Sequence, residues 1–198
     1  MYKNFFKRFF DFIITLIAII CISPILILFI ILLHISNKGA GVFFYQERPG
    51  KGGNLFKVIK FKSMTDEKDE NGVLLPNDQR VTKIGRFILK YSIEELPQLF
   101  NILKGDMSLI GPRPLLKRYL ELYTPEQARR HEVRPGMTGW AQVNGRNNIT
   151  WSDKFKLDVW YVDHCSLWLD IKIVFKTVKS VFAGKDVVVV SGSFDGTN

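Results

Sequence analysis

The fold is decided by one stretch of sequence, Phe12–Ile35, which reads FIITLIAIICISPILILFIILLHI. Uncharged apolar runs longer than about 18 residues are typical of helices embedded in a membrane. Pro24 lacks a backbone donor and clashes with the carbonyl four residues before it, which disfavours a straight helix. Each half has about 12 residues, or about 18 Å of helix, too short to cross the bilayer core alone. We therefore expect a membrane-embedded helix that bends at Ser23-Pro24.

Basic residues flank this stretch on both sides. Lys3, Lys7 and Arg8 precede it, and Lys38 and Arg48 are the first of several that follow. Because basic flanks favour the cytoplasmic side of a membrane, a re-entrant helix that returns to its side of entry satisfies both ends. We predict such a helix over residues 1–38, with the Ser23 hydroxyl available to carbonyls freed at the bend.

Two other interpretations of the apolar stretch were weighed. A spanning helix with a proline kink is tolerated in membranes and stays open. A cleaved signal peptide is disfavoured, because the run is too long and lacks a clear small-residue cleavage site.

The rest of the chain has the size and charge of one basic domain. The protein has 198 residues, a formal net charge of +9 and a pI near 9.6. Roughly 160 residues follow the membrane segment, which suits one compact domain. We place a catalytic domain at residues 39–186 and a C-terminal tail at residues 187–198. The charge suits anionic partners, and the membrane segment favours bilayer lipids and phosphorylated substrates over nucleic acid.

Cysteine and histidine usage limits the kinds of site. Cys21 lies inside the apolar run and Cys165 lies far from it, so we expect no disulfide framework and a reducing, cytoplasmic setting. The three histidines lack the spacing of a zinc site. Any metal should therefore be a hard cation held by carboxylates.

The pattern along the domain predicts an α+β, helix-rich fold. Strand-like residues at 42–45 and 55–62 enclose a Gly/Pro turn, which predicts a hairpin with Lys60 and Lys62 on one face of its second strand. Residues 66–78 are typical of an exposed loop, and residues 82–89 and 97–105 of helices, the second with Pro97 first and Gly105 last.

The C-terminal part has a basic amphipathic pattern from Ile171 to Phe182. This pattern fits a helix at a membrane surface and equally an ordinary helix that covers the core. Residues 187–190 fit a strand, and residues from Ser191 onward fit a frayed end.

Two adjacent acids, Glu94 and Glu95, precede the helix at 97–105. Ser92 and Glu95 have the spacing of a capping box, which is a purely structural interpretation. Pro97 disfavours it, because a helix that starts at Ile93 would carry this proline in its interior. If the helix begins at Pro97, both carboxylates lie just ahead of its N-terminus, where the dipole favours their ionised forms.

Five cationic side chains are candidates for binding phosphate: Lys60, Lys62, Arg113, Arg134 and Arg146. The arginines lie in loops stiffened by Pro and Gly, and guanidinium groups bind phosphate oxygens in a bidentate manner. A carboxylate pair can supply one ligand for Mg²⁺ and one nucleophile or base. Phosphoryl transfer needs these parts. The alternative is a surface acid pair among solvated arginines.

Several motifs occur together in a fixed order: Lys60–Met64, Glu95–Leu99, Lys104–Pro114 and Arg134–Gly139. With these motifs and Ser23-Pro24, the whole chain resembles the bacterial sugar transferase family, which comprises the monotopic phosphoglycosyl transferases. The short form, with one N-terminal hydrophobic segment, is similar to the PglC type of protein glycosylation pathways.

The resemblance implies transfer of a phosphosugar from a UDP-sugar to polyprenol phosphate (undecaprenyl phosphate), with release of UMP. It implies an N-acetylated, bacillosamine-type sugar and a catalytic domain on the cytoplasmic face of the bacterial inner membrane. The family uses an Asp-Glu pair, whose positions are Glu94 and Glu95 in this chain. The first residue would be the nucleophile that forms a covalent phosphosugar intermediate, and Glu95 would be the ligand of Mg²⁺.

The chain departs from the family pattern at two positions. Glu94 replaces the family's Asp, and its extra methylene moves the carboxylate by about 1 Å, a misplacement that can cost on the order of a hundredfold in rate. The family also carries Arg near Leu89, where only Lys90 offers a cation.

Two other functions remain open. Initiation of exopolysaccharide synthesis with UDP-glucose or UDP-galactose is the alternative within the enzyme class, although the short chain is unlike the long form of that group. A membrane-anchored basic binding module is the alternative outside it. The chain lacks aromatic RNA-stacking motifs, and its basic residues lie beside acids, which disfavours this second alternative.

Overall fold

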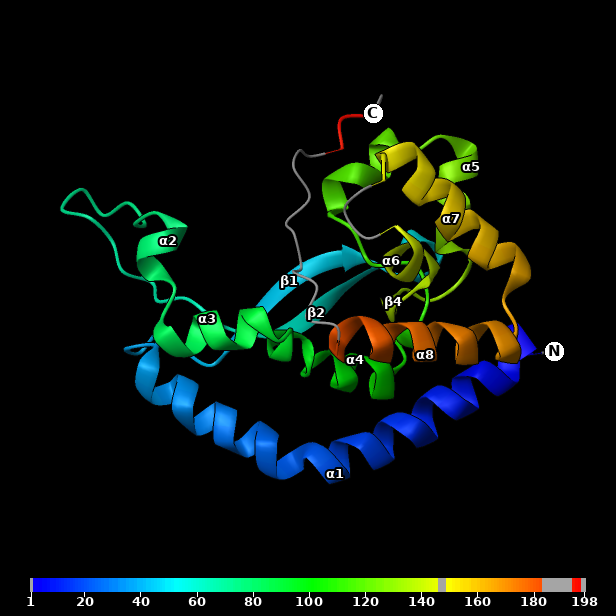
Figure 1. Cartoon of the computed structure of the whole chain (residues 1–198). Coiled ribbons are helices and arrows are strands. Elements are labelled where there is room, and N and C mark those ends of the chain that lie inside the picture. Colours follow the sequence, from blue (N-terminus) through cyan, green and yellow to red (C-terminus); the bar gives the residue numbers. More distant parts are fainter. Residues whose placement is uncertain (1, 146–148, 183–193, 197–198) are drawn as a thin grey trace.

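The computed structural model describes residues 2–145, 149–182 and 194–196. Over these residues the chain is helix-rich and carries two small two-stranded sheets, which confirms the α+β class (Figure 1). The α-helices are α1 (Lys7–Ser36), α2 (Asn77–Arg80), α3 (Lys83–Lys90), α4 (Gln98–Lys104), α5 (Pro125–Ala128), α6 (Trp140–Asn144), α7 (Trp151–His164) and α8 (Leu167–Phe182). The strands are β1 (Phe43–Pro49), β2 (Leu55–Phe61), β3 (Ser108–Ile110) and β4 (Gly136–Thr138). A π-helical turn, η1 (Tyr2–Phe6), precedes α1, and the 3₁₀ helices are η2 (Lys51–Gly53), η3 (Ile93–Glu95), η4 (Lys117–Leu122) and η5 (Arg129–Glu132).

The apolar stretch forms one continuous helix, α1, which curves like a bow with its concave side toward the rest of the domain (Figure 1). Pro24 lies inside this helix, which continues through it unbroken, so the expected bend at Ser23-Pro24 takes the form of a curve along one helix. Because proline has no N–H, the carbonyl of Ile20 loses its usual donor. The Ser23 hydroxyl donates to that carbonyl at 2.8 Å. The polar group freed by the proline is therefore satisfied in the way the sequence predicted.

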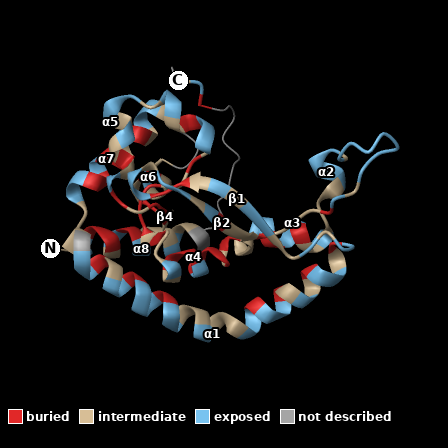
Figure 2. Ribbon diagram, turned by 180° about the vertical axis from the view of Figure 1, so that it is seen from behind, coloured by how far each residue is buried: buried red, intermediate tan, exposed pale blue. Residues whose placement is uncertain are grey.

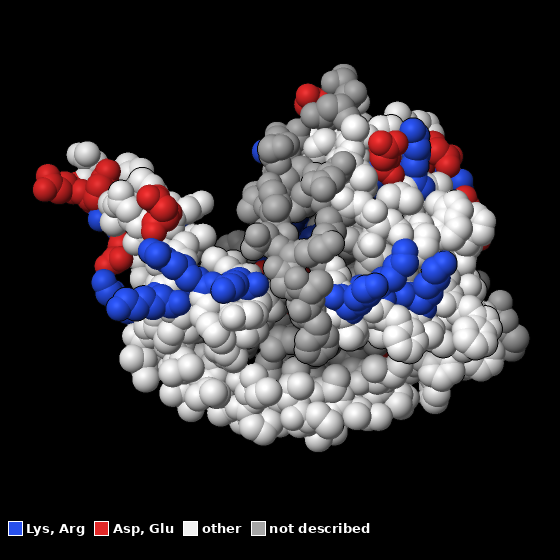
Figure 3. Space-filling view, viewed as in Figure 1, with Lys and Arg blue, Asp and Glu red and all other residues white. Residues whose placement is uncertain are grey.

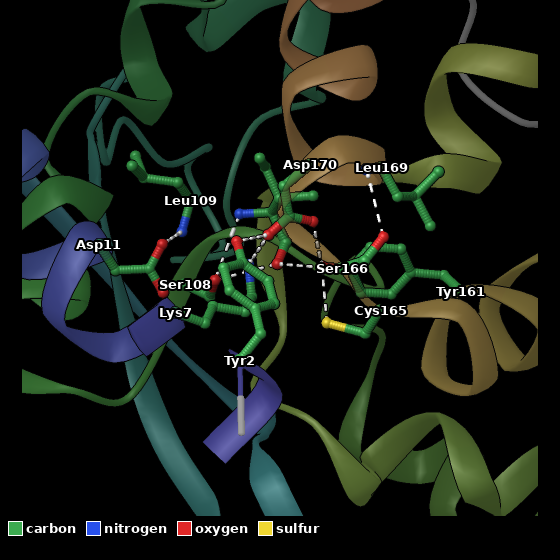
Figure 4. A network of polar contacts seen from close by, with 11 residues as sticks. Tyr2, Lys7, Asp11, Ser108, Leu109, Tyr161, Cys165, Ser166, Leu169 and Asp170 are labelled. Carbon is green, nitrogen blue, oxygen red and sulfur yellow. Dashed lines mark hydrogen bonds and ion pairs between the residues drawn. The ribbon is translucent and has the colours of Figure 1, made fainter. Parts of the chain in front are cut away.

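Buried polar contacts fix the N-terminal end of α1 to α8 (Figure 4). The Lys7 ammonium donates to Asp170 Oδ2 at 2.6 Å, and both side chains are buried. The hydroxyls of Tyr2 and Tyr161 donate to the same carboxylate at 2.6 and 2.7 Å. Since a buried charge left without its partner costs roughly 3–5 kcal/mol, this end of the helix is firmly held.

The C-terminal end of α1 is fixed to the β-hairpin and to α3. Leu33 is fully buried in one apolar cluster with Phe61 of β2 and Ile88 of α3. Asn37, which follows the helix, donates from its side-chain amide to the Lys62 carbonyl at 2.8 Å. Both ends of α1 therefore contact the same domain.

Between these ends, α1 presents apolar side chains outward, and exposed residues follow its outer side (Figure 2). Ile17 and Ile20, for example, are 56% and 65% exposed. Within the described part of the chain, α1 is the one helix long and apolar enough to cross a membrane. A surface of this kind is stable in lipid and not in water.

The β-hairpin confirms the sequence prediction and extends it. β1 and β2 pair antiparallel from Phe43 opposite Phe61 to Pro49 opposite Leu55, so β1 runs four residues beyond the predicted 42–45. Gly52 and Gly53 supply the turn with φ values of 68° and 79°, which glycine adopts without strain.

The second sheet, formed by β3 and β4, was not predicted from the sequence. Ser108 pairs with Gly136, and Ile110 with Thr138, in parallel. Strands of three residues are too short to show alternation. A Cβ at Gly136 would lie 2.0 Å from the Gly111 nitrogen, so this pairing needs glycine.

The helix predictions hold where the structure describes the chain. α3 and α4 match within about a residue, with Pro97 at the N-cap of α4 and left-handed Gly105 at its C-cap. The predicted helix from Ile171 is the later part of α8. The predicted strand at 187–190 lies outside the described residues. The predicted fraying is wrong at Phe194, which is 3% exposed because aromatic side chains surround it.

Candidate active site

Glu95 lies at the centre of a cluster of charged side chains. It is 8% exposed, at the end of η3. Its Oε1 accepts from the Lys60 ammonium of β2 at 2.8 Å and from Arg113 Nη2 at 2.5 Å. Arg113 Nη1 reaches Glu95 Oε2 at 3.4 Å. The structure thus brings together three of the predicted site residues, which lie far apart in the sequence.

The local backbone places both acids between α3 and α4. Ser92 adopts a left-handed conformation with φ 55°, which turns the chain from α3 into η3. Its side chain makes no capping hydrogen bond, and the Glu95 carboxylate binds Arg113 and Lys60 instead. The capping-box interpretation is therefore wrong, and the helix does start at Pro97 and Gln98.

The two neighbouring carboxyls have very different acidities. Burial alone would raise the pKa of Glu95, but the charges and hydrogen bonds of Arg113 and Lys60 outweigh burial and lower that pKa to about 2. Burial, and then the charge of Glu95, raise the pKa of Glu94 to about 7. Two neighbouring carboxyls with such different pKa values are typical of sites that use one as a charged group and the other in proton or group transfer.

The raised pKa of Glu94 opposes the expectation that the helix dipole favours its ionised form. α4 has only seven residues, and dipole effects of about 0.3–1 kcal/mol are smaller than the effects of burial and a neighbouring like charge. Glu94 Oε2 is buried and has no hydrogen-bond partner among the residues that the structure describes. This oxygen is available to a substrate or a cation.

Arg113 is held through its backbone as well as through its guanidinium. Arg130 Nη2 donates to the Arg113 carbonyl at 2.8 Å. Arg130 is 2% exposed and pairs with buried Asp158 at 2.7 Å. In the same loop, a Cβ on Gly111 would lie 2.4 Å from the Arg134 carbonyl, so the backbones are in close contact. The loop is therefore stiff, as its Gly and Pro residues predicted.

Two further cations interact electrostatically with Arg113, and the sequence analysis missed both. Partial burial, and then the charge of Arg113, lower the pKa of Arg48 of β1, which also donates from Nη2 to Gln46 Oε1 at 2.6 Å. Burial also lowers the pKa of Lys154 of α7; Asp158 opposes this, and the charges of Arg130 and Arg113 add to it. Arg48 lay in predicted turn chemistry, and the sequence analysis made no prediction for the region of Lys154, so neither gave a signal. Both are cations under repulsion that an anion would relieve.

The remaining predicted cations have other outcomes. The Lys62 ammonium binds the Ala40 carbonyl at 2.9 Å and pairs with Asp66. Arg134 Nε donates to the Gly105 carbonyl at 2.8 Å, in a polar cleft at the N-terminal end of α1. Neither makes a described contact with Glu95. Arg146 lies outside the described residues.

An apolar cavity of about 160 Å³ lies next to the charged cluster. It is enclosed by the middle of α1, the β-hairpin and the start of α4. Pro97, two residues after Glu95, is one of its walls. The lining residues are Ile19, Ser23, Leu26, Ile27, Ile30, Phe43, Phe61, Pro97 and Phe100. An apolar cavity lined by α1 therefore begins two residues along the chain from Glu95.

Basic side chains gather over α3 and α8, at similar height above the apolar surface of α1 (Figure 3). They are exposed or partly exposed: Lys83, Arg86 and Lys90 on α3, and Lys172, Lys176 and Lys179 on α8. Exposed apolar residues alternate with them, such as Phe87 at 48% and Phe175 at 71%. This pattern is typical of helices at a membrane interface.

Comparison with known proteins identifies the family. A family model described as bacterial sugar transferase matches residues 2–184. The chain is 55% identical over 181 residues to uncharacterized sugar transferase EpsL of Bacillus subtilis, covering 91% of this chain and 89% of that one. It is 41% identical over 188 residues to UDP-N-acetylgalactosamine-undecaprenyl-phosphate N-acetylgalactosaminephosphotransferase of Aeromonas hydrophila, and 39% identical over 196 residues to undecaprenyl-phosphate galactose phosphotransferase of Salmonella typhimurium. These matches cover 91% and 90% of this chain but only 44% and 41% of those two relatives. The chain belongs to the bacterial sugar transferase family.

Proposed function

We propose that this protein is a phosphoglycosyl transferase that moves a phosphosugar from a UDP-sugar to polyprenol phosphate and releases UMP. The observation that carries the proposal is the Glu94–Glu95 pair, in which Glu95 is buried and Glu94 half-buried, set among cations and close in the chain to an apolar cavity. The cations suit a diphosphate, and the cavity suits a lipid tail. The names of the relatives support the same chemistry.

Glu94 is the proposed nucleophile. One of its carboxylate oxygens attacks the phosphorus that carries the sugar, and the bond from this phosphorus to the oxygen bridging the two phosphates breaks. UMP leaves with that bonding electron pair, and an acyl-phosphate sugar remains on Glu94. A phosphate oxygen of the polyprenol phosphate then attacks the same phosphorus and displaces Glu94 as a carboxylate. The buried Glu94 Oε2, with no partner among the described residues, supports this role.

The cations divide into two groups. Lys60 and Arg113 hold Glu95 ionised and in place. Arg48 and Lys154 face the same region, and no ion pair to either appears among the described contacts. These two are the candidates for binding the diphosphate, whose developing charge must be stabilised as UMP leaves.

We further propose that the enzyme uses Mg²⁺, with Glu95 as a protein ligand. In the described part of the chain, no group of three or more His, Cys, Asp or Glu side chains converges on a metal position. Mg²⁺ is often held by one or two carboxylates together with substrate phosphates, so this donor set still fits. Glu95 Oε2 has only one long contact, and Glu94 Oε2 has none among the described residues. When bound, the ion would neutralise charge on the diphosphate.

The proposed membrane arrangement is monotopic, with α1 re-entrant and the active site on the cytoplasmic face of the bacterial inner membrane. A helix whose two ends contact the same domain is hard to reconcile with a span that leaves them on opposite sides. Basic residues at both ends favour the cytoplasmic side. The cavity between α1 and Pro97 would receive the first units of the prenyl chain, so the lipid phosphate reaches Glu94.

Two sugar classes remain candidates. The resemblance to the PglC type supports an N-acetylated, bacillosamine-type UDP-sugar for protein glycosylation. The relatives named for galactose and N-acetylgalactosamine favour a UDP-hexose or UDP-N-acetylhexosamine, as in the initiation of a polysaccharide.

UMP release tests the proposal directly. The purified membrane fraction is incubated with undecaprenyl phosphate and each member of a panel of UDP-sugars, and UMP is quantified. We expect release with one sugar class, dependent on the lipid phosphate, and none from the Glu94→Ala variant. Binding of anionic vesicles without UMP release from any UDP-sugar would instead favour the basic binding module.

A further inference from the structure

Phe194, near the C-terminus, packs against the domain, and its side chain is 3% exposed. It enters an aromatic box formed by Tyr119, Tyr123, Trp151 and Phe155. The ring centroids lie between 4.9 and 6.1 Å from that of Phe194. The Phe194 backbone N–H also donates to the Tyr119 hydroxyl at 3.3 Å. Phe194 is therefore held in a defined position by ring contacts and one hydrogen bond.

The aromatic box holds Arg130 from one side. The Arg130 guanidinium lies over the rings of Tyr123 and Phe155, with its central carbon 5.8 and 5.6 Å from their centroids. Arg130 Nη1 also donates to the Tyr123 hydroxyl at 3.1 Å. Cation–π contacts of this kind strengthen when they are buried, and Arg130 is 2% exposed. Phe194 packs against both of these rings and so limits where they can lie.

Arg130 in turn connects the aromatic box to the proposed active site. Its Nη2 donates to the Arg113 carbonyl, and the Arg113 guanidinium binds Glu95. Four contacts in sequence therefore lead from Phe194 through the box and Arg130 to Arg113 and Glu95. The family model ends at residue 184, so Phe194 lies beyond the matched part of the chain.

We propose that Phe194 is a positioning residue: by completing the aromatic box, the C-terminal tail fixes Arg130 and thereby the Arg113 loop against Glu95. The proposal rests on the proposed function, because Arg113 is assigned to the site of that reaction. Removing the Phe194 ring would let Tyr123 and Phe155 relax, and displacement of a catalytic loop by about 1 Å can cost on the order of a hundredfold in rate. Because Phe194 acts only through Arg130 and the Arg113 loop, we expect the rate to fall by about tenfold.

The kinetic test is a double-mutant cycle on the full-length protein. Phe194→Ala should lower kcat/KM for UMP release about tenfold, and Phe194→Leu, which refills most of the space, should recover most of that loss. Combined with Arg113→Lys, Phe194→Ala should cost little more, because the residue through which it acts is already changed. Additive losses would overturn the proposal. Faster UMP release by Phe194→Ala would also overturn it and would make the tail an inhibitor.

Hydrogen exchange gives a readout that needs no activity. Phe194→Ala should speed exchange at the backbone amides of Gly111, Arg113 and Leu115, the residues of the 111–115 segment that carry an N–H. Phe29→Ala is the matched control, because Phe29 is also a buried phenylalanine, 8% exposed, but lies in α1, where its ring stacks with Phe87 and contacts Phe61 at a tilt. It should lower the melting temperature and leave exchange at residues 111–115 unchanged. Equal exchange in wild type and Phe194→Ala would overturn the proposal. If the wild type exchanges as expected but releases no UMP, the proposed function fails instead.

Discussion

The rate of UMP release should fall steeply below about pH 7, because Glu94 must be ionised to attack. Burial and the charge of Glu95 raise the pKa of Glu94 from 4.5 to about 7. A carboxyl with a pKa near 7 is about one-tenth ionised one pH unit lower, whereas an ordinary glutamate is almost fully ionised there. The rate of UMP release should therefore fall about tenfold for each pH unit below neutrality.

The same shift has a thermodynamic consequence with a definite sign. The folded protein binds the Glu94 proton more tightly than the unfolded chain, so the contribution of Glu94 to stability is full below pH 4.5 and is lost as the pH rises through about 7. At about 1.4 kcal/mol per pKa unit, the loss is of order 3 kcal/mol. Glu95 acts oppositely: its stabilising contribution is present above pH 4.5 and is lost as the pH falls toward about 2.

The assay is single-turnover UMP release between pH 5.5 and 8.5, measured at low and at high Mg²⁺. Raising Mg²⁺ should move the acid limb to lower pH, because a cation bound by the carboxylates favours their ionised forms. Glu95→Gln should also move it lower, because it removes the like charge and leaves Lys60 and Arg113 to act on Glu94. A rate that is flat from pH 5.5 to 8 would refute Glu94 as a nucleophile with a raised pKa. A wild-type rate for Glu94→Ala would refute the covalent step itself.

Three further outcomes are expected. Arg113→Lys should lower kcat/KM by tenfold or more, because it loses the two-nitrogen contact with Glu95, whereas the matched variant Arg134→Lys should stay near wild type; equal losses in both would contradict the placement of Arg134 away from the site. Lys154→Met should raise KM for the UDP-sugar about tenfold or more, as expected for a lost contact with a charged group of roughly 1.5–3 kcal/mol, and an unchanged KM would remove Lys154 from the diphosphate site. Pro24→Leu combined with Lys7→Met should make a cysteine introduced at position 2 accessible from the periplasmic side, because the proline and the buried pair with α8 are both lost; labelling of that cysteine in a protein with Tyr2→Cys as its only change would instead refute the re-entrant arrangement.

Local chemistry explains why so much of the fold was predictable. Pro97 and Gly105 can occupy few positions in a helix, so they bound α4 almost to the residue. Gly52 and Gly53 likewise define the turn between β1 and β2. Ser23 compensates for Pro24 within one helical turn, where sequence spacing is already spatial distance. In each case the deciding interaction lies within a few residues of the pattern that predicts it.

The site could be predicted only in part, because its decisive contacts are distant in sequence. Lys60, Glu95 and Arg113 were each recognised from their own motifs, but their convergence on one carboxylate depends on the packing of β2, η3 and the Arg113 loop. No sequence motif marks Arg48 or Lys154. Their lowered pKa values result mainly from burial, which only the folded chain reveals. The raised pKa of Glu94 has the same origin, because burial is a property of the folded chain and not of adjacent residues.

The charge balance of the site explains how these residues can act together. Glu95 is already paired with Lys60 and Arg113, whereas no ion pair to Arg48 or Lys154 appears among the described contacts. Burial, and then the charge of Arg113, lower the pKa of Arg48, and burial lowers the pKa of Lys154 although Asp158 opposes it. A negatively charged diphosphate bound near these two cations would favour their charged forms. Because this interaction would be largely electrostatic and Arg48 and Lys154 are only partly exposed, KM for the UDP-sugar should rise moderately with salt. A KM that does not change between low and high ionic strength would mean that these cations do not bind the diphosphate.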